Sequence, residues 1–212
     1  MAFEVRNDRI PFRRQYVSVV ILLLNVVMFI VQLLDPEGDM LIEAAFVPAS
    51  LYRGERLWTI ATSMFMHANF IHIFFNMLFF YVVADNCEDA MGHAYFLFTY
   101  LISGLAATFL HAGFSLVASA ARNIPTLGAS GAIAGIIAVY GILFPNNRLR
   151  VLLGYIFIRV RARQYILIFF LMQVVFGLLL WDLATTAYFA HLGGFLAGAV
   201  CAFVFKLMSE KF

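Results

Sequence analysis

Ser130 is the residue whose surroundings most clearly suggest chemistry. It lies in the stretch LGASGAIAG (residues 127–135), between Gly128 and Gly131, and it opens an apolar segment after a turn at Pro125. A hydroxyl at a helix N-terminus meets unpaired backbone N–H groups and the positive end of the helix dipole. Those groups stabilise the oxyanion of acyl transfer. Taken alone, such a short pattern more often marks a helix cap with packing glycines, so other residues must decide.

His191 is the side chain best suited to activate this serine, because a serine is a poor nucleophile until an adjacent base takes its proton. His191, Gly194 and Gly198 are spaced i, i+3, i+7 in an apolar segment, so the imidazole shares a helix face with the glycines. The segment of Ser130 carries its own row of small residues, beginning at Gly131. Two such rows let helix backbones approach closely, which would bring Ser130 and His191 within hydrogen-bond reach.

A third apolar segment contains His72 and Asn76, which are four residues apart and so share one helix face. Both side chains can donate hydrogen bonds, as an oxyanion site requires. His67 falls on the opposite side of an ideal helix, and we expect a structural role for it in the entry turn. A zinc site formed by these three residues is the alternative, but the spacing lacks the carboxylate of a His-Glu-x-x-His motif. We therefore predict no metal and no cofactor.

The composition indicates an integral membrane protein. Of 212 residues, 64% are hydrophobic and only 12% are charged, whereas soluble domains carry about 25% charged residues. The mean hydropathy is +0.92. A net charge of +2 without a basic patch argues against nucleic acid as a partner, and the two cysteines make no disulfide framework.

Hydropathy predicts an all-α membrane protein with six transmembrane helices in one domain. Residues 1–16 form a polar, arginine-rich segment, and residues 17–208 form the bundle. We expect an acidic turn over residues 85–92 and an interfacial segment over residues 148–163, whose apolar run is too short to span. The first apolar segment lacks a small-residue cleavage site, so it is expected to be a permanent span. The predicted spans cover residues 17–34, 57–84, 95–117, 128–144, 165–181 and 188–207.

Basic residues predict the orientation of the bundle. With the N-terminus in the cytoplasm, eleven Lys and Arg residues fall on that side, and only Arg53, Arg56 and Arg122 fall on the other. Both termini are therefore expected to be cytoplasmic. The same topology places Ser130, His191, His72 and Asn76 at a similar depth, near the external side. Polar side chains within spans usually mark a functional site, whereas His93 and His111, at predicted span ends, are expected to be interfacial.

Three motifs together resemble the rhomboid family of intramembrane serine proteases. They are the GASG sequence at 128–131, the AHLGG sequence at 190–194 with Gly198, and the spacing of His67, His72 and Asn76. The resemblance covers nearly the whole chain. It implies that Ser130 is the nucleophile and His191 the general base, and that His72, Asn76 and the Ser130 N–H form the oxyanion hole.

The same resemblance implies a substrate and a setting. The substrate would be the transmembrane helix of another protein, cut near its outer end, within the lipid bilayer of a prokaryotic cell membrane. Water would enter beneath a loop over residues 182–187, beside a mobile fifth span. Asp182 is expected to be a loop residue, because the family works with a Ser-His dyad; the oligomeric state is left open.

Two departures from the family pattern affect these expectations. Trp58 is followed by Thr59 where members often have arginine, which puts in doubt any ion pair of the nearby Arg56. Some members place an aromatic residue beneath the histidine, four residues after the serine. That position here is Ala134, so something else must orient His191.

Two rival functions are weighed against the protease. A non-catalytic relative that binds client helices is possible, but such proteins characteristically lose the serine or the histidine, and this chain has both. A transporter or channel would need a carboxylate or other charge along a pathway, and no acidic residue falls inside a predicted span.

Overall fold

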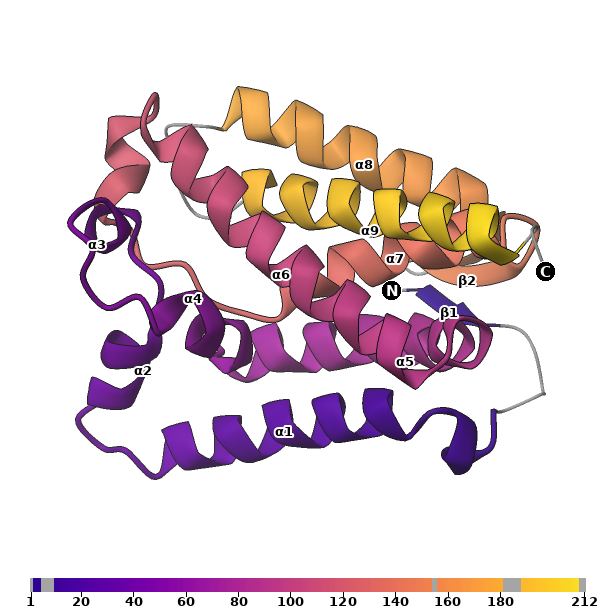
Figure 1. Cartoon of the computed structure of the whole chain (residues 1–212), viewed down its shortest axis with the longest axis horizontal. Helices are drawn as coiled ribbons and strands as arrows, with labels where there is room; N and C mark the ends of the chain where they lie inside the picture. Colours follow the sequence, from indigo (N-terminus) through magenta and orange to yellow (C-terminus); the bar gives the residue numbers. More distant parts are fainter. Residues whose placement is uncertain (1, 5–9, 154–155, 181–187, 210–212) are drawn as a thin grey trace.

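The computed structural model describes residues 2–4, 10–153, 156–180 and 188–209. These residues form a bundle of roughly parallel and antiparallel helices with a small sheet at one end (Figure 1). Within these described residues, five helices are long and apolar enough to cross a membrane. They are α1 (Tyr16–Leu33), α5 (Phe70–Met91), α6 (His93–Ser115), α8 (Ala162–Leu179) and α9 (Tyr188–Ser209).

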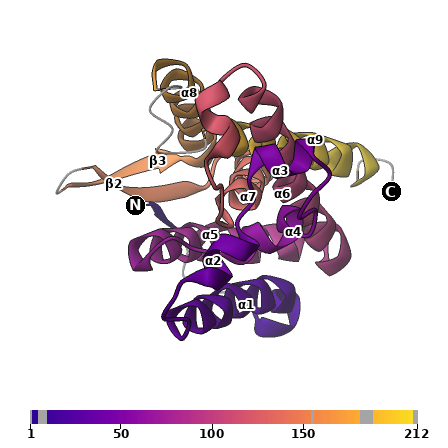
Figure 2. The same cartoon turned by 90° about the vertical axis from the view of Figure 1, so that its left-hand side faces the viewer.

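The sixth helix, α7 (Ser130–Leu143), occupies the centre of the bundle. It contacts α5, α6, α8 and α9, which surround it when the molecule is viewed end-on (Figure 2). Its 14 residues extend about 21 Å, less than the roughly 30 Å of a hydrocarbon core. Every residue from Gly131 to Gly141 is buried, because the helix is apolar on all sides and carries small residues that let its neighbours approach. The described residues thus contain a helix for each of the six predicted spans, and the helix that begins at Ser130 is surrounded by four of the other five.

The segment predicted as the second span begins later than expected. Its first residues form two short elements, α4 (Thr59–Thr62) and the 3-10 helix η2 (Ser63–Phe65), and α5 starts only at Phe70. The break occurs because Asn69 is extended and caps α5, with its Oδ1 accepting the His72 N–H at 2.9 Å. His67 therefore lies in the loop before α5, in agreement with its expected position in the entry turn.

The predicted acidic turn over residues 85–92 is wrong. Helix α5 continues to Met91 and turns only at Gly92, whose φ of +76° favours glycine. Glu88 is completely buried in this last part of α5. Its carboxylate accepts the N–H groups of Val17 at 2.9 Å and Ser18 at 2.6 Å, and His93 Nδ1 lies 2.6 Å from it. A helix begins with unpaired N–H groups, so Glu88 serves as the cap of α1 rather than as a charge on a pathway.

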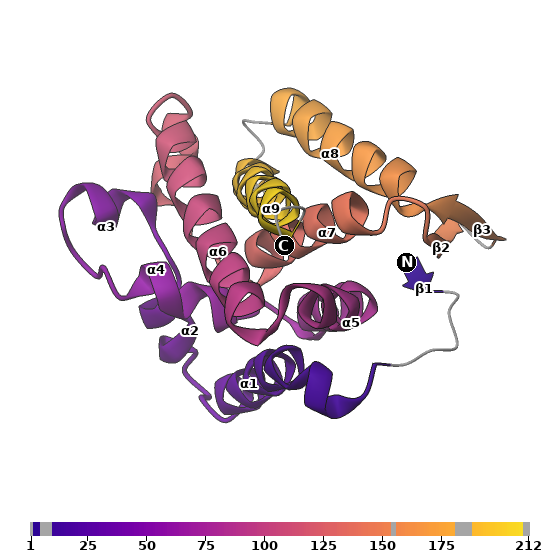
Figure 3. The same ribbon diagram turned by 45° about the vertical axis from the view of Figure 1, so that its right-hand side comes forward.

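A three-stranded antiparallel sheet, which the sequence did not predict, lies where the interfacial segment was expected. Its strands are β1 (Ala2–Glu4), β2 (Arg148–Leu153) and β3 (Ile156–Arg161), in the order β1-β2-β3, with Arg150 paired to Phe3 and to Arg159. The hairpin projects beside the start of α8 (Figure 3). Residues 148–150 alternate between exposed arginine and buried leucine, which is the period of a strand.

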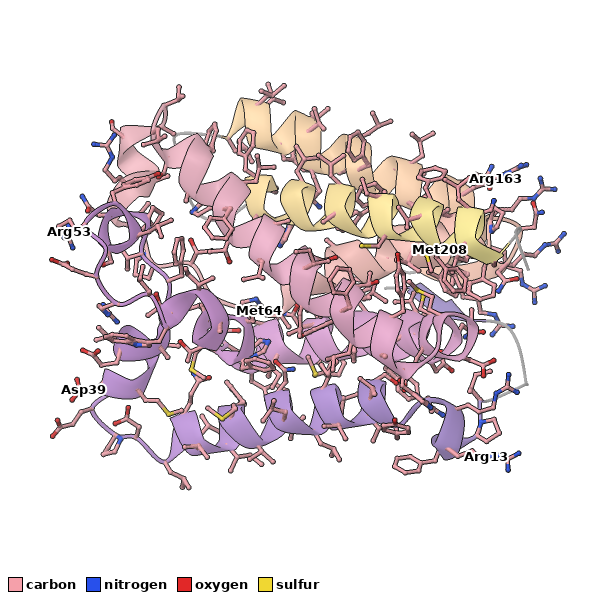
Figure 4. The ribbon with its side chains drawn as sticks, in the orientation of Figure 1. Arg13, Asp39, Arg53, Met64, Arg163 and Met208 are labelled. Atoms are coloured by element: carbon pink, nitrogen blue, oxygen red, sulfur yellow. The ribbon has the colours of Figure 1, made fainter. Side chains whose placement is uncertain are left out.

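The two ends of the bundle differ in charge and in structure. Figure 4 shows Arg13 and Arg163 at the end that carries the sheet, and Asp39 and Arg53 at the opposite end. That opposite end is built from short elements, including α2 (Asp39–Ala44), α3 (Pro48–Tyr52) and the 3-10 helix η3 (Ser119–Asn123). Helices α5, α7 and α9 all start toward it (Figure 1). The side chains in their first turns therefore lie toward the end of the molecule away from the arginine-rich sheet.

Candidate active site

Ser130 and His191 are joined by a hydrogen bond. Their Oγ and Nε2 atoms are 2.8 Å apart, although the residues are 61 positions apart in the chain. Ser130 is the first residue of α7, and Ala129 occupies the cap position before it. The hydroxyl is therefore turned toward the imidazole of α9. This geometry favours a nucleophile and base over the simpler interpretation of Ser130 as a helix cap.

Close contact between the backbones of α7 and α9 produces this hydrogen bond. A β-carbon added to Gly194 would overlap the carbonyl of Gly131, and one added to Gly198 would overlap the carbonyl of Gly135. Only glycines allow two helices to lie this near each other along a shared face. The approach places the first turn of α9, with His191, directly beside the first residue of α7.

His72 lies next to the loop that leads into α7. Gly128 has a φ of +117°, and a β-carbon there would be 2.8 Å from His72 Cε1 and Nε2, so the loop and the imidazole can meet only at a glycine. The Ala68 N–H points at His72 Nδ1 from 3.4 Å. If Nδ1 accepts, the ring proton is on Nε2, which faces the Gly128 loop. His72 can therefore donate a hydrogen bond toward the loop that leads to Ser130.

Asn76 lies one turn further along α5 and is 5% exposed. Its Nδ2 donates to the backbone carbonyl of His72 at 3.1 Å. An amide nitrogen has two protons, so this bond orients the side chain and leaves Nδ2 a second donor. The two α5 residues singled out in the sequence are thus linked to each other as well as being close to the α7 loop.

His67 is buried beside α1 rather than in the group around Ser130. Its backbone exchanges two hydrogen bonds of 3.0 Å with the Gln32 amide, and its ring packs edge-on against Phe29 and His72. Burial is the main cause that lowers the pKa of His67 to about 4, and the nearby His72 lowers it further. His67 lies in the loop before α5, and its backbone bonds to Gln32 and its ring contact with Phe29 attach that loop to α1.

Gln173 of α8 is the residue that the sequence analysis missed. Its Oε1 lies 3.0 Å from His191 Nδ1, so both nitrogens of the imidazole have partners. A lone amide in the apolar segment 165–181 was visible in the sequence, and a polar side chain within a span usually has a partner or a function. Ala134, by contrast, packs with Phe195 and the partly buried Phe169.

His111, which was expected to be interfacial, has its side chain buried in the protein. It is 7% exposed, and its Nε2 lies 2.9 Å from the hydroxyl of Thr126. Helix α6 ends at Ser115, so His111 lies one turn from its end, where the predicted span also put it. His93, the other histidine expected at an interface, is a third exposed in its side chain and lies against Glu88.

A cavity of about 790 Å³ brings the candidate residues together. Helices α5, α6, α7, α8 and α9 and the loop before α7 all contribute to its wall. Its polar side chains include those of Ser130, His191, His72, Asn76 and His111. Among the described residues, no three His, Cys, Asp or Glu side chains converge as a metal site would require. The arrangement offers a hydroxyl, a base and nitrogen donors, which is the equipment of acyl transfer.

Comparison with known proteins identifies the family of this chain. Residues 54–207 match the family described as Rhomboid domain, a range that includes all of these side chains. The chain belongs to the rhomboid family. It is an integral membrane protein built on the rhomboid helical bundle.

Several curated relatives are named as proteases. The chain is 24% identical to "Rhomboid protease GlpG" of Salmonella typhi, over 98% of this chain and 71% of the relative. It is 28% identical to "Rhomboid protease AarA" of Providencia stuartii, over 73% of this chain and 58% of the relative. It is 30% identical to "Rhomboid-like protease 3" of Toxoplasma gondii, over 75% and 55%. The chain spans about half the length of several curated relatives that it matches.

Two further expectations from the resemblance concern Arg56 and the loop over residues 182–187. Arg56, whose pairing was in doubt, donates to the Ile42 carbonyl and lies 3.7 Å from the exposed Glu43 carboxylate. It belongs to the loop elements around α2, away from Ser130. The loop expected to cover the water entrance, residues 182–187 with Asp182, lies outside the described residues.

Proposed function

We propose that this rhomboid protein is an intramembrane serine protease that uses Ser130 and His191 as a catalytic dyad. The observation that carries the proposal is the 2.8 Å hydrogen bond between Ser130 Oγ and His191 Nε2. It joins a nucleophile to a base at the wall of a cavity large enough to admit an extended peptide segment. A protein that only bound client helices would have no need for this pair or for the nitrogen donors near it.

The reaction would follow the usual course of acyl transfer. Ser130 Oγ attacks the scissile carbonyl carbon while its proton moves to His191 Nε2. The oxyanion is stabilised by Nε2–H of His72, by the second Nδ2 proton of Asn76 and by the N–H of Ser130. The imidazolium then protonates the leaving amine, and an acyl ester remains on Ser130. A water molecule that gives its proton to His191 hydrolyses the ester and releases the carboxylate product.

The substrate that this architecture fits is a transmembrane helix of another protein, unwound near one end. The proposed orientation puts both termini in the cytoplasm and the site near the external face; it is supported by the position of the site at the end of the bundle away from the arginine-rich sheet. Under that topology the enzyme cuts close to the external surface of a prokaryotic membrane. No cofactor takes part in this chemistry.

The test uses an active-site probe, since no substrate is needed for it. The purified protein in mild detergent is treated with a fluorescent fluorophosphonate, in parallel with the variants Ser130→Ala and His191→Ala. Labelling of the parent that disappears in both variants is the expected result. A folded parent that neither labels nor cleaves a synthetic single-span helix would contradict the proposal and favour a client-binding, non-catalytic relative.

A further inference from the structure

We propose that Gln173 is a positioning residue that holds His191 in the tautomer and orientation needed to accept the proton of Ser130. This inference rests on the proposed function, because it assigns the partner that a dyad requires on the far side of its base. Some family members orient the histidine with an aromatic residue at the position that is Ala134 here, and Gln173 takes over that role in this chain.

The two hydrogen bonds of His191 determine which of its ring nitrogens carries the proton. Gln173 Oε1 is a carbonyl oxygen and can only accept, so the nitrogen facing it at 3.0 Å, Nδ1, carries the ring proton. A neutral imidazole has one N–H, which leaves the lone pair on Nε2. That lone pair is 2.8 Å from Ser130 Oγ and accepts the hydroxyl proton. The tautomer needed for general-base catalysis is thereby selected by Gln173.

Helix α8 is built to bring Gln173 to this place. Only Ala162 and Gly177 are buried among its 18 residues, and the other residues are exposed or half-buried. Gly177 is one turn after Gln173 on the same face. A β-carbon at Gly177 would come within 3.3 Å of Tyr188 Cβ and 3.4 Å of Phe189 Cε2. This close approach to the first turn of α9 lets the Gln173 amide reach the imidazole.

An amide suits this position better than a carboxylate would. An ionised Asp or Glu would favour the imidazolium and would itself be expensive to bury beside lipid-facing helices. A neutral acceptor fixes the ring without charging it. Two other titratable side chains, His72 of α5 and His111 of α6, line the same cavity as His191, and no carboxylate of the described residues lines it.

The experiment compares three variants with the parent. Gln173→Met keeps the length of the side chain and removes the acceptor. Gln173→Glu restores an acceptor but adds charge, and Met172→Leu is the matched control on the exposed face of the same helix. The second-order rate of fluorophosphonate labelling is measured from pH 5 to pH 9 for each protein, with thermal unfolding recorded alongside.

The proposal predicts a distinct profile for each variant. Gln173→Met should label about 10- to 100-fold more slowly than the parent at every pH while unfolding at a similar temperature, since a misoriented base loses part of its usual contribution. In Gln173→Glu the low-pH side of the profile should move toward neutral pH by about one unit or more, because an ionised carboxylate favours the protonated imidazole. Met172→Leu should match the parent.

The outcomes separate this inference from the proposed function. A parent that labels through Ser130, together with a Gln173→Met variant that labels equally fast, overturns the role of Gln173 and leaves the protease intact. If Gln173→Met fails to fold, Gln173→Glu decides: an unmoved low-pH side overturns the role and a shifted one supports it. A parent without Ser130-dependent labelling defeats the proposed function itself, and the role of Gln173 fails with it.

Discussion

Gly194 of α9 lies directly against the carbonyl group of Gly131 in α7, so that not even a β-carbon fits between the two backbones. Each of these glycines is close to one member of the Ser130–His191 pair: Gly131 follows the serine, and Gly194 is three residues after the histidine. The contact that holds the two helices together therefore also fixes the distance between the two side chains. Packing and chemistry cannot be altered separately here.

Replacement of Gly194 by leucine should destabilise the protein. The added side chain meets backbone atoms of α7, which cannot rotate away, so the helices must separate at a cost of roughly 1–3 kcal/mol or more. The measurement is thermal unfolding in detergent, together with labelling of Ser130. Gly113→Ala is the control, because a β-carbon at Gly113 meets nothing within 4 Å. A Gly194→Leu variant that melts with the parent would show that the close approach is unnecessary.

Loss of the Glu88 carboxylate should weaken the junction of α1 and α5. In Glu88→Ala the buried N–H groups of Val17 and Ser18 lose their acceptor, and leaving such groups unpaired costs about 1–3 kcal/mol. We expect a lower unfolding temperature but an unchanged rate of fluorophosphonate labelling at Ser130. Thermal unfolding and labelling are measured on the same preparation of the protein. Glu37→Gln, at an exposed position, should be silent. Equal melting of Glu88→Ala and Glu37→Gln would remove Glu88 from the stability of the fold.

The bundle could be predicted because long apolar segments leave few alternatives in a membrane. The site could be predicted for a related reason. Polar side chains are rare in membrane spans, so Ser130, His191 and His72 stand out in the sequence. Gln173 has the same signal, but nothing in its spacing connects it with His191, and only the packing of α8 on α9 through Gly177 brings them together.

The errors arose where local pattern and tertiary contact compete. The sheet is not evident from segment length, which predicts only that residues 148–163 do not span, whereas the arginine–leucine alternation at residues 148–150 has the period of a strand. Glu88 looked like a turn residue because a charge at the end of an apolar run usually faces water. Its burial depends on the backbone N–H groups of α1, which are 70 residues away in the chain.

The two α5 donors should be partly redundant in catalysis. Asn76→Ala should slow turnover by about 10²-fold or less, because the remaining donors still reach the oxyanion, and His72→Ala should slow it by a similar factor. The double variant should lose more than either single one. Cleavage of a synthetic single-span helix is the measurement, since the oxyanion forms during turnover. Unchanged cleavage in the double variant would exclude α5 from the mechanism.

Acid should destabilise the folded protein partly through His67. The pKa of this ring is about 4 in the folded chain, mainly because it is buried, against an ordinary value of 6.5. Above pH 6.5 both folded and unfolded forms are neutral at this position, and His67 adds no pH dependence. As the pH falls from 6.5 toward 4, the unfolded chain takes up a proton that the folded chain excludes, so the free energy of unfolding decreases.

The variant His67→Phe isolates this contribution, because it keeps an aromatic ring beside Phe29 but cannot titrate. Unfolding temperatures of parent and variant are compared at several values between pH 4 and pH 7.5. Whatever the offset between the two proteins at neutral pH, the parent should lose more stability on acidification than His67→Phe does. Parallel curves over the whole range would mean that His67 is protonated as readily in the folded protein as in the unfolded one, and its ring would then have to be in contact with water.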